Sequence, residues 1–209
     1  MKVNVLPVGQ LATNCYIVFS KSDAVIIDPG DDAGFIINKI KDLELKPKLI
    51  LATHGHFDHV LAATELKLAF NIPFFIHKND EFLLKRMSQT AKYFIGFDPG
   101  PAPIPDNFLK ESEVIKFGLD KLTVIYTPGH TPGSVSFYSK GVVFSGDLLF
   151  SGGAVGRTDL EGGDKQLLDK SIKKILKLPG ITTIYAGHGQ ETSVQEEKQY
   201  HLKLTGPQA

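Results

Sequence analysis

The sequence has no excess of charge of either sign and no long apolar run. Its 209 residues carry 23 basic and 23 acidic side chains, so the formal net charge is zero. A balanced chain produces no overall field that would attract nucleic acid or an anionic membrane surface. No apolar run reaches the roughly 20 residues of a membrane-spanning helix, and residues 1–9 lack the apolar segment of a signal peptide. We therefore expect a soluble cytoplasmic protein without a nucleic-acid or membrane partner.

Cysteine and arginine are both scarce. The single cysteine, Cys15, cannot form an internal disulfide, which favours a reducing compartment, and its position in an expected strand favours a small buried apolar side chain. Only two arginines stand against 21 lysines. One of them, Arg157, lies in a glycine-rich stretch, where it can bind a substrate carboxylate through both nitrogens or pair with Asp159. The sequence leaves both roles open.

Short β-branched runs alternate with amphipathic stretches in both halves of the chain. We expect strands at residues 3–8, 14–19, 24–28, 48–53, 74–76, 114–117, 122–126, 135–138, 142–145 and 183–186. We expect helices between a cap at Asp32 and Pro47, over residues 60–70, between a cap at Asp164 and Pro179, and after a capping box at residues 193–196. The proline-rich residues 97–103 are expected to form a long surface loop.

Strands and helices follow one another in the same order twice. This order predicts an α+β fold in which two mixed sheets pack face to face with helices on the outside. The length suits one large domain, no linker divides the chain, and we expect residues 1–209 to form a single domain.

Three of the seven histidines fall within residues 54–59, which read HGHFDH. Three imidazoles and a carboxylate on one turn repel one another as they protonate, unless a cation holds them together. His54 and His56 can point the same way from an extended segment, whereas Asp58 and His59 can face a second position. The string therefore predicts metal binding, with ligands for two sites.

Three later residues are suited to complete these sites. His130, Asp147 and His188 each follow the end of an expected strand and lie beside glycine, where the backbone can approach a shared centre closely. Each is weak evidence by itself. Together with the histidine string they indicate one metal centre.

These motifs resemble those of the metallo-β-lactamase superfamily, and within it the short glyoxalase II-like hydrolases related to hydroxyacylglutathione hydrolase. The resemblance spans nearly the whole chain and includes residues 14–16, 28–30, 54–59, 129–133, 145–147, 156–159 and 187–189. It implies an αββα sandwich. It also implies one metal held by His54, His56 and His130, a second held by Asp58, His59 and His188, and Asp147 bridging the two.

The resemblance further implies two divalent ions per chain, zinc in the first place, with iron or manganese as alternatives because imidazole and carboxylate accept all three. Two such ions about 3.5 to 4 Å apart would hold a bridging hydroxide as nucleophile and polarise a carbonyl. Counting the ions, two carboxylates and the hydroxide gives a site charge of about +1, which favours an anionic substrate. We expect hydrolysis of a small-molecule thioester, with Asp58 orienting the hydroxide.

Other activities of the superfamily stay open. A persulfide dioxygenase would hold one iron through His54, His130 and Asp147, and a lactonase could use the same site. Only 21 residues follow His188, too few for the helical extension of full-length glyoxalase II, so recognition of glutathione is an open question. Because no cysteine ligand is evident, β-lactam hydrolysis is disfavoured.

Three further residues are assigned places outside the metal centre. We expect Asp28 to fix a loop behind the site as a hydrogen-bond acceptor. We expect His77 and His201 to lie on the surface.

Overall fold

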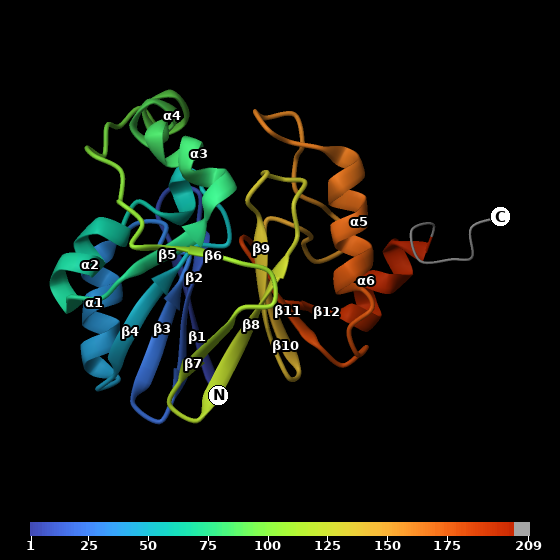
Figure 1. Cartoon of the computed structure of the whole chain (residues 1–209), viewed down its shortest axis with the longest axis horizontal. Coiled ribbons are helices and arrows are strands. Elements are labelled where there is room, and N and C mark those ends of the chain that lie inside the picture. Colours follow the sequence, from blue (N-terminus) through green and yellow to red (C-terminus); the bar gives the residue numbers. More distant parts are fainter. Residues whose placement is uncertain (203–209) are drawn as a thin grey trace.

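The fold consists of two six-stranded sheets that face each other, with helices outside them (Figure 1). It was obtained as a computed structural model, and the structure describes residues 1–202. The arrangement confirms the α+β sandwich of two mixed sheets. Among the described residues, no helix combines the length and the apolar composition needed to cross a membrane.

The first sheet contains the first half of the chain. Its strands run in the order β1-β2-β3-β4-β5-β6, antiparallel from β1 to β3 and parallel from β3 to β6. Their bounds are β1 Lys2–Val8, β2 Thr13–Ser20, β3 Asp23–Ile27, β4 Lys46–Leu51, β5 Phe74–His77 and β6 Asn107–Leu109. Because β3, β4 and β5 are parallel, their carboxyl ends meet at one edge of the sheet.

The second sheet has the order β12-β11-β10-β9-β8-β7 and a single parallel pair, β10 with β11. Its strands are β7 Val114–Phe117, β8 Asp120–Tyr126, β9 Val135–Ser139, β10 Val142–Gly146, β11 Thr183–Ala186 and β12 Thr192–Ser193. The carboxyl ends of β10 and β11 lie side by side. In open α/β sheets, ligands bind outside the carboxyl ends of the parallel strands.

The apolar core has three layers, which follow from the alternation of side chains along each strand. On β3, Val25 and Ile27 pack between the two sheets, whereas Ala24 and Ile26 face the opposite side, toward the first pair of helices. The third layer lies between the second sheet and α5. A strand such as β3, which is buried on both faces, is therefore apolar almost without interruption.

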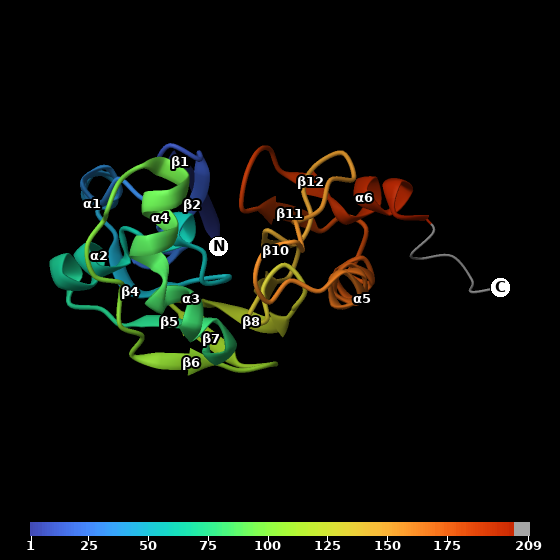
Figure 2. The same cartoon turned by 90° about the horizontal axis from the view of Figure 1, so that it is seen from above.

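Helices cover the outer faces of both sheets, as the two views show (Figures 1 and 2). The helices are α1 Ala33–Asp42, α2 Ala63–Phe70, α3 Glu81–Lys85, α4 Met87–Ile95, α5 Lys165–Ile175 and α6 Val194–Tyr200, with short 3-10 turns η1 Phe57–His59 and η2 Lys78–Asp80. α1 and α2 lie outside the first sheet, and α5 and α6 lie outside the second. α3 and α4 lie at the edge where the strands of the first sheet end (Figure 1).

Two backbone hydrogen bonds join the sheets at this edge. The N–H of Val135 on β9 donates to Thr53 O, 2.8 Å away, just after β4. The N–H of Asn14 on β2 donates to Gly187 O, 2.7 Å away, just after β11. The loops that carry the expected metal ligands are therefore tied to each other by main-chain contacts.

The two helix caps predicted in the second half of the chain are confirmed, whereas the cap predicted in the first half is wrong. Asp164 accepts a hydrogen bond from Leu167 N, and the capping box of Ser193 and Glu196 is complete. Asp32 precedes α1 but makes no capping bond, because its carboxylate accepts from Gly9 N instead. α1 ends at Asp42, and Pro47 lies inside β4.

Residues 97–103 form the expected irregular loop, which follows a helix that the sequence did not predict, α4. One further expectation is corrected. His201 is buried, at 9% exposure, because it lies one helical turn from the buried Glu197 on α6. His77 is half-buried and stacks on Tyr126, with ring centroids 4.7 Å apart.

Candidate metal centre

The histidine string lies directly after β4, at the edge where the two sheets are joined. His54 and His59 are buried, at 1% and 0% exposure. His56 precedes the turn η1, and this turn sends His59 back toward His54, with ring centroids 4.1 Å apart. A tight turn of this kind explains how four donors from six residues reach one cavity.

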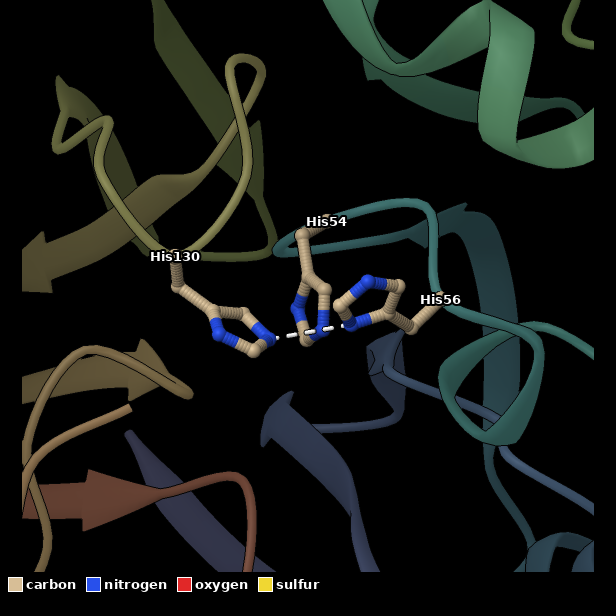
Figure 3. Close-up of side chains that lie close together, drawn as sticks. All are labelled: His54, His56 and His130. Carbon is tan, nitrogen blue, oxygen red and sulfur yellow. Dashed lines mark hydrogen bonds between the residues drawn. The ribbon is translucent and has the colours of Figure 1, made fainter. Parts of the chain in front are cut away.

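The second sheet brings the remaining expected ligands to the same place. His130 follows β8, Asp147 follows β10 and His188 follows β11. Figure 3 shows the imidazole of His130 approaching those of His54 and His56 from the opposite loop. His130 Nε2 lies 2.9 Å from His56 Nδ1.

All seven residues expected as ligands lie in this centre. Their donor atoms form three groups, each within 4.8 Å, which could hold a metal ion: His54, His56 and His130; His54, His59 and Asp147; and Asp58, His59 and His188. The first and last groups are the two triads that the family resemblance implied. Asp147 lies between them, since its carboxylate oxygens are 3.5 Å from His59 Nε2, 3.6 Å from His188 Nε2 and 3.7 Å from His130 Nε2.

Outer acceptors orient three of the imidazoles. His130 Nδ1 lies 2.7 Å from Arg157 O, His188 Nδ1 lies 3.1 Å from Leu11 O, and His59 Nδ1 lies 3.0 Å from Asp28 Oδ2. In His130 and His188 the carbonyl oxygen accepts from Nδ1, which leaves Nε2 free to face the centre, whereas His59 forms an ion pair with Asp28. This is the usual arrangement around metal-binding histidines.

The polar atoms in the centre fit a divalent metal. His54 Nε2, His59 Nε2 and Asp147 Oδ1 are buried and have no hydrogen-bond partner among the described residues. Buried polar atoms without a partner are costly, so a set that points to one place indicates a ligand. Imidazole nitrogens and carboxylate oxygens are donors that zinc, iron and manganese accept.

The pKa values follow from burial and from the mixture of charges. Burial lowers the pKa of His54 well below its usual value and lowers that of His56 to about 3, with a further contribution from His130. Burial also opposes the charged form of His59, but Asp58, Asp147 and Asp28 outweigh it and raise its pKa to about 10. Before an ion binds, His59 is therefore a cation balanced by these three carboxylates, and a bound ion would take the place of its proton on Nε2.

Asp28 has the role expected of it. Its two oxygens accept from Thr53 N and Thr53 Oγ1, each at 2.7 Å, and the second oxygen also faces His59. It lies behind the centre, at 1% exposure. Asp28 thus fixes both the end of β4 and one imidazole ring.

Asp80 is a residue that the sequence did not single out. Its buried carboxylate accepts from Gly55 N at 2.8 Å, Thr131 Oγ1 at 2.7 Å and Gly133 N at 2.6 Å. Gly55 lies between two ligands of the first triad, and Thr131 and Gly133 follow its third ligand, His130. Asp80 therefore holds together the two loops that carry this triad. Its position after β5, at the same sheet edge as the histidine string, is the signal that could have identified it.

Arg157 forms the pair with Asp159 that was one of its two expected roles. Its Nε and Nη2 donate to the two carboxylate oxygens at 2.8 and 2.6 Å. Contact with a substrate carboxylate stays a prediction.

Residues 8–188 match the profile of the Metallo-beta-lactamase superfamily. The chain belongs to this superfamily. The match extends from β1 to the last expected metal ligand, so it covers both sheets and the whole centre.

Known members of the superfamily resemble the chain over nearly its full length. A protein named hydroxyacylglutathione hydrolase GloC, from Haemophilus influenzae, is 39% identical over 204 residues, which cover 95% of each chain. A solved structure described as BLEG-1 B3 metallo-beta-lactamase is 38% identical, with a TM-score of 0.90 over 98% of this chain and 100% of the other. TTHA1623, solved in a di-iron-bound form, is 38% identical, with a TM-score of 0.88 over 95% and 98%. As a metallo-β-lactamase superfamily member, the chain is a metal-dependent enzyme.

Proposed function

We propose that this enzyme hydrolyses thioesters in the manner of hydroxyacylglutathione hydrolase, with two divalent ions, zinc or alternatively iron or manganese. The proposal rests on one observation, the two complete ligand triads that share Asp147 between them. His54, His56 and His130 would hold one ion, and Asp58, His59 and His188 the other. The relative named hydroxyacylglutathione hydrolase supports the same substrate class.

The overall reaction adds water to the acyl carbon and breaks the C–S bond, which gives a carboxylic acid and a thiol. When bound, two divalent ions would lower the pKa of a water molecule and polarise the carbonyl. A thiolate is a good leaving group, so the chain does not have to supply a strong general acid. The net charge of the loaded site also favours an anionic substrate.

Asp58 is placed to orient the water. Its Oδ2 accepts a hydrogen bond from Thr13 Oγ1 at 3.2 Å and lies 3.3 Å from His188 Nε2. Burial works to raise the pKa of Asp58, but His59 and His188 outweigh it and hold that pKa below the ordinary range. The carboxylate is therefore an ionised acceptor that faces the centre.

Elemental analysis followed by a substrate screen tests the proposal. We expect two metal ions per chain and hydrolysis of S-lactoylglutathione or of other thioesters. One iron per chain with thiol-dependent oxygen uptake would identify a persulfide dioxygenase instead. Hydrolysis of lactones but of no thioester would favour the lactonase alternative.

Replacement of Asp58 tests the residue assignment. In Asp58→Ala we expect the metal content to fall toward one ion per chain and turnover to fall by at least 100-fold, because one ligand and the orienting acceptor are lost together. Asp42→Ala, in which an exposed carboxylate on α1 is removed, serves as the matched control. Full thioester hydrolysis by Asp58→Ala would contradict the assignment.

β-Lactam hydrolysis is a second candidate, because one similar structure is described as a B3 metallo-beta-lactamase. The sequence disfavours this activity because no cysteine ligand is evident. In the structure, Cys15 is buried in β2 and does not belong to the three ligand groups found among residues 1–202. The same zinc-loaded preparation can be tested against a chromogenic cephalosporin. A higher kcat/KM for the cephalosporin than for every thioester would reverse the order of the two candidates.

A further inference from the structure

An open apolar groove lies beside the candidate metal centre. It has a volume of about 400 Å³, within the usual range of small-molecule pockets. One wall is formed by α3 and α4, and the other by the loop at Leu160 and Glu161. The apolar side chains that line it are Phe57, Leu83, Met87, Tyr93, Phe94 and Leu160.

The groove is continuous with the cavity that contains the metal ligands. That cavity, about 250 Å³ in volume, is lined by His130, Asp147 and Arg157. The two hollows share five lining residues: His56, Phe57, Thr90, Phe94 and Leu160. A substrate whose scissile bond lies at the metal ligands can therefore place one of its substituents in the groove, because the two hollows are continuous.

The groove wall is built on the ligand loop itself. Phe57 stands in the chain between the expected ligands His56 and Asp58, and its ring stacks on Phe94 of α4, with centroids 6.1 Å apart and planes inclined by 16°. Phe94 is 47% exposed and the neighbouring Tyr93 is 82% exposed. Large apolar side chains exposed around a cavity indicate a surface that a ligand covers.

Charged groups around the groove are already paired within the chain. Arg86 forms an ion pair with Glu161 across the groove, and Arg157 pairs with Asp159. These are the only two arginines of the sequence. Because each cation has its own carboxylate, the groove offers contact to an uncharged group rather than a free charge to an anionic one.

We propose that the groove binds the apolar acyl group of the thioester, which makes this enzyme selective for acyl chains of about four to eight carbons or for arylacyl groups. The inference rests on the proposed thioester hydrolysis and adds the acyl class to it. The acyl group is the occupant because water-soluble thiol carriers are polar and charged, so they do not match an apolar wall. Phe94 and Leu160, which line both hollows, determine the specificity.

A series of thioesters of one thiol tests the proposal on the zinc-loaded full chain. We expect kcat/KM for S-hexanoyl and S-phenylacetyl N-acetylcysteamine to exceed that for the S-acetyl compound by roughly tenfold or more. In Phe94→Ala and Leu160→Ala the hexanoyl-to-acetyl ratio should fall by about fivefold, mainly through KM. Phe35→Ala removes a similarly exposed phenylalanine from α1, at 53% exposure, and should leave the ratio unchanged.

Binding of the uncharged apolar dye N-phenyl-1-naphthylamine, followed by fluorescence, provides a readout that does not depend on hydrolysis. We expect dye binding that weakens at least threefold in Phe94→Ala, but not in Phe35→Ala, and that hexanol displaces. Equal kcat/KM for acetyl and hexanoyl thioesters would overturn the groove assignment and leave thioester hydrolysis standing. If no thioester is hydrolysed, the proposed function fails, and dye binding then decides whether the groove accepts apolar ligands at all.

Discussion

At Gly187 the backbone lies very close to two candidate metal ligands. A Cβ atom added at this residue would overlap Asp147 Oδ1 and lie 2.8 Å from His59 Cε1. The main chain of the residue is also used, because its carbonyl accepts from Asn14 N. Only a residue without a side chain leaves Asp147 in reach of both triads.

Gly187→Ala should therefore affect metal binding more than folding. The added methyl group displaces Asp147 from between the triads, so we expect at least tenfold weaker binding of one ion, measured by zinc titration, and a corresponding loss of turnover. Gly34→Ala on α1 is the matched control, since a Cβ there meets nothing within 4 Å and alanine favours a helix by about 0.5–1 kcal/mol. Unchanged zinc affinity in Gly187→Ala would show that Asp147 can move without loss.

Asp80 makes stability depend on pH in an unusual direction. Burial raises its pKa to about 6 from the ordinary 3.8, although hydrogen bonds from Thr131, Gly55 and Gly133 work to lower it. The unfolded chain thus loses this proton at lower pH than the folded chain. The contribution of Asp80 to stability is complete below about pH 4 and is lost as the pH rises through 6.

Comparison with Asp80→Asn isolates this contribution, because the amide does not titrate. One pKa unit corresponds to about 1.4 kcal/mol, and part of the change lies below pH 4, so the unfolding free energy of the wild type minus that of the variant should fall by about 2–3 kcal/mol between pH 4 and pH 7. Urea denaturation of both metal-free proteins at several pH values measures the difference. A difference that grows with pH would mean that the three hydrogen bonds outweigh burial.

At the scale of elements, α5 is a helix whose start was predicted correctly. Asp164 accepts a hydrogen bond from Leu167 N at 2.9 Å, and its own N–H donates to Gly129 O at 2.8 Å in the loop that carries His130. Leu168 and Ile172 then bury the inner face of the helix. Here the capping residue and the periodic apolar face predict the same helix, so the helix could be located without knowledge of contacts that are distant in the sequence.

Asp164→Ala should destabilise the protein by about 1 kcal/mol, the usual cost of losing an N-terminal cap. Asp169→Ala lies on the same helix and removes a surface pair with Lys165, which should cost about 0.2–0.5 kcal/mol. Urea denaturation of the two variants measures both values. Equal losses would indicate that the cap contributes no more than a surface pair.

The start of α1 shows why a similar pattern can mislead. Asp32 stands before an amphipathic stretch, as Asp164 does, but its backbone has a positive φ of 53° and its carboxylate accepts from Gly9 N in the turn after β1. The competing donor is 23 residues away in the chain. Local sequence cannot reveal a donor that only the folded sheet brings close.

The same reason separates the parts of the site that could be predicted from those that could not. His54, His130 and His188 each follow a strand, so the element pattern alone brings them to one edge. The position of Asp80 after β5 places it at this edge as well, but its partner Gly133 lies 53 residues further along the chain, so the sequence does not show what its carboxylate holds. Likewise, the groove depends on α4, whose apolar face the sequence did not separate from the irregular loop after it.

At the scale of the whole molecule, the candidate metal centre connects the two sheets. Four of the seven expected ligands follow β4 of the first sheet, and His130, Asp147 and His188 follow strands of the second. Bound ions would therefore add to the two backbone hydrogen bonds that already join this edge. Stability should depend on metal because the unfolded chain cannot present ligands from both sheets at once.

Removal of metal should consequently loosen the sandwich at this edge. At a free metal concentration 1,000-fold above Kd, one ion stabilises the fold by about 4 kcal/mol, so chelation with EDTA should lower Tm by roughly 10 °C. Amide hydrogen exchange at Val135, whose N–H donates to Thr53 across the sheets, should accelerate more than exchange at Val25 in the middle of the first sheet. Addition of zinc should restore both values, whereas magnesium should not, since it favours all-oxygen ligands. If Tm and exchange at Val135 stay the same when elemental analysis shows that metal has been removed, the ions do not hold the sheets together.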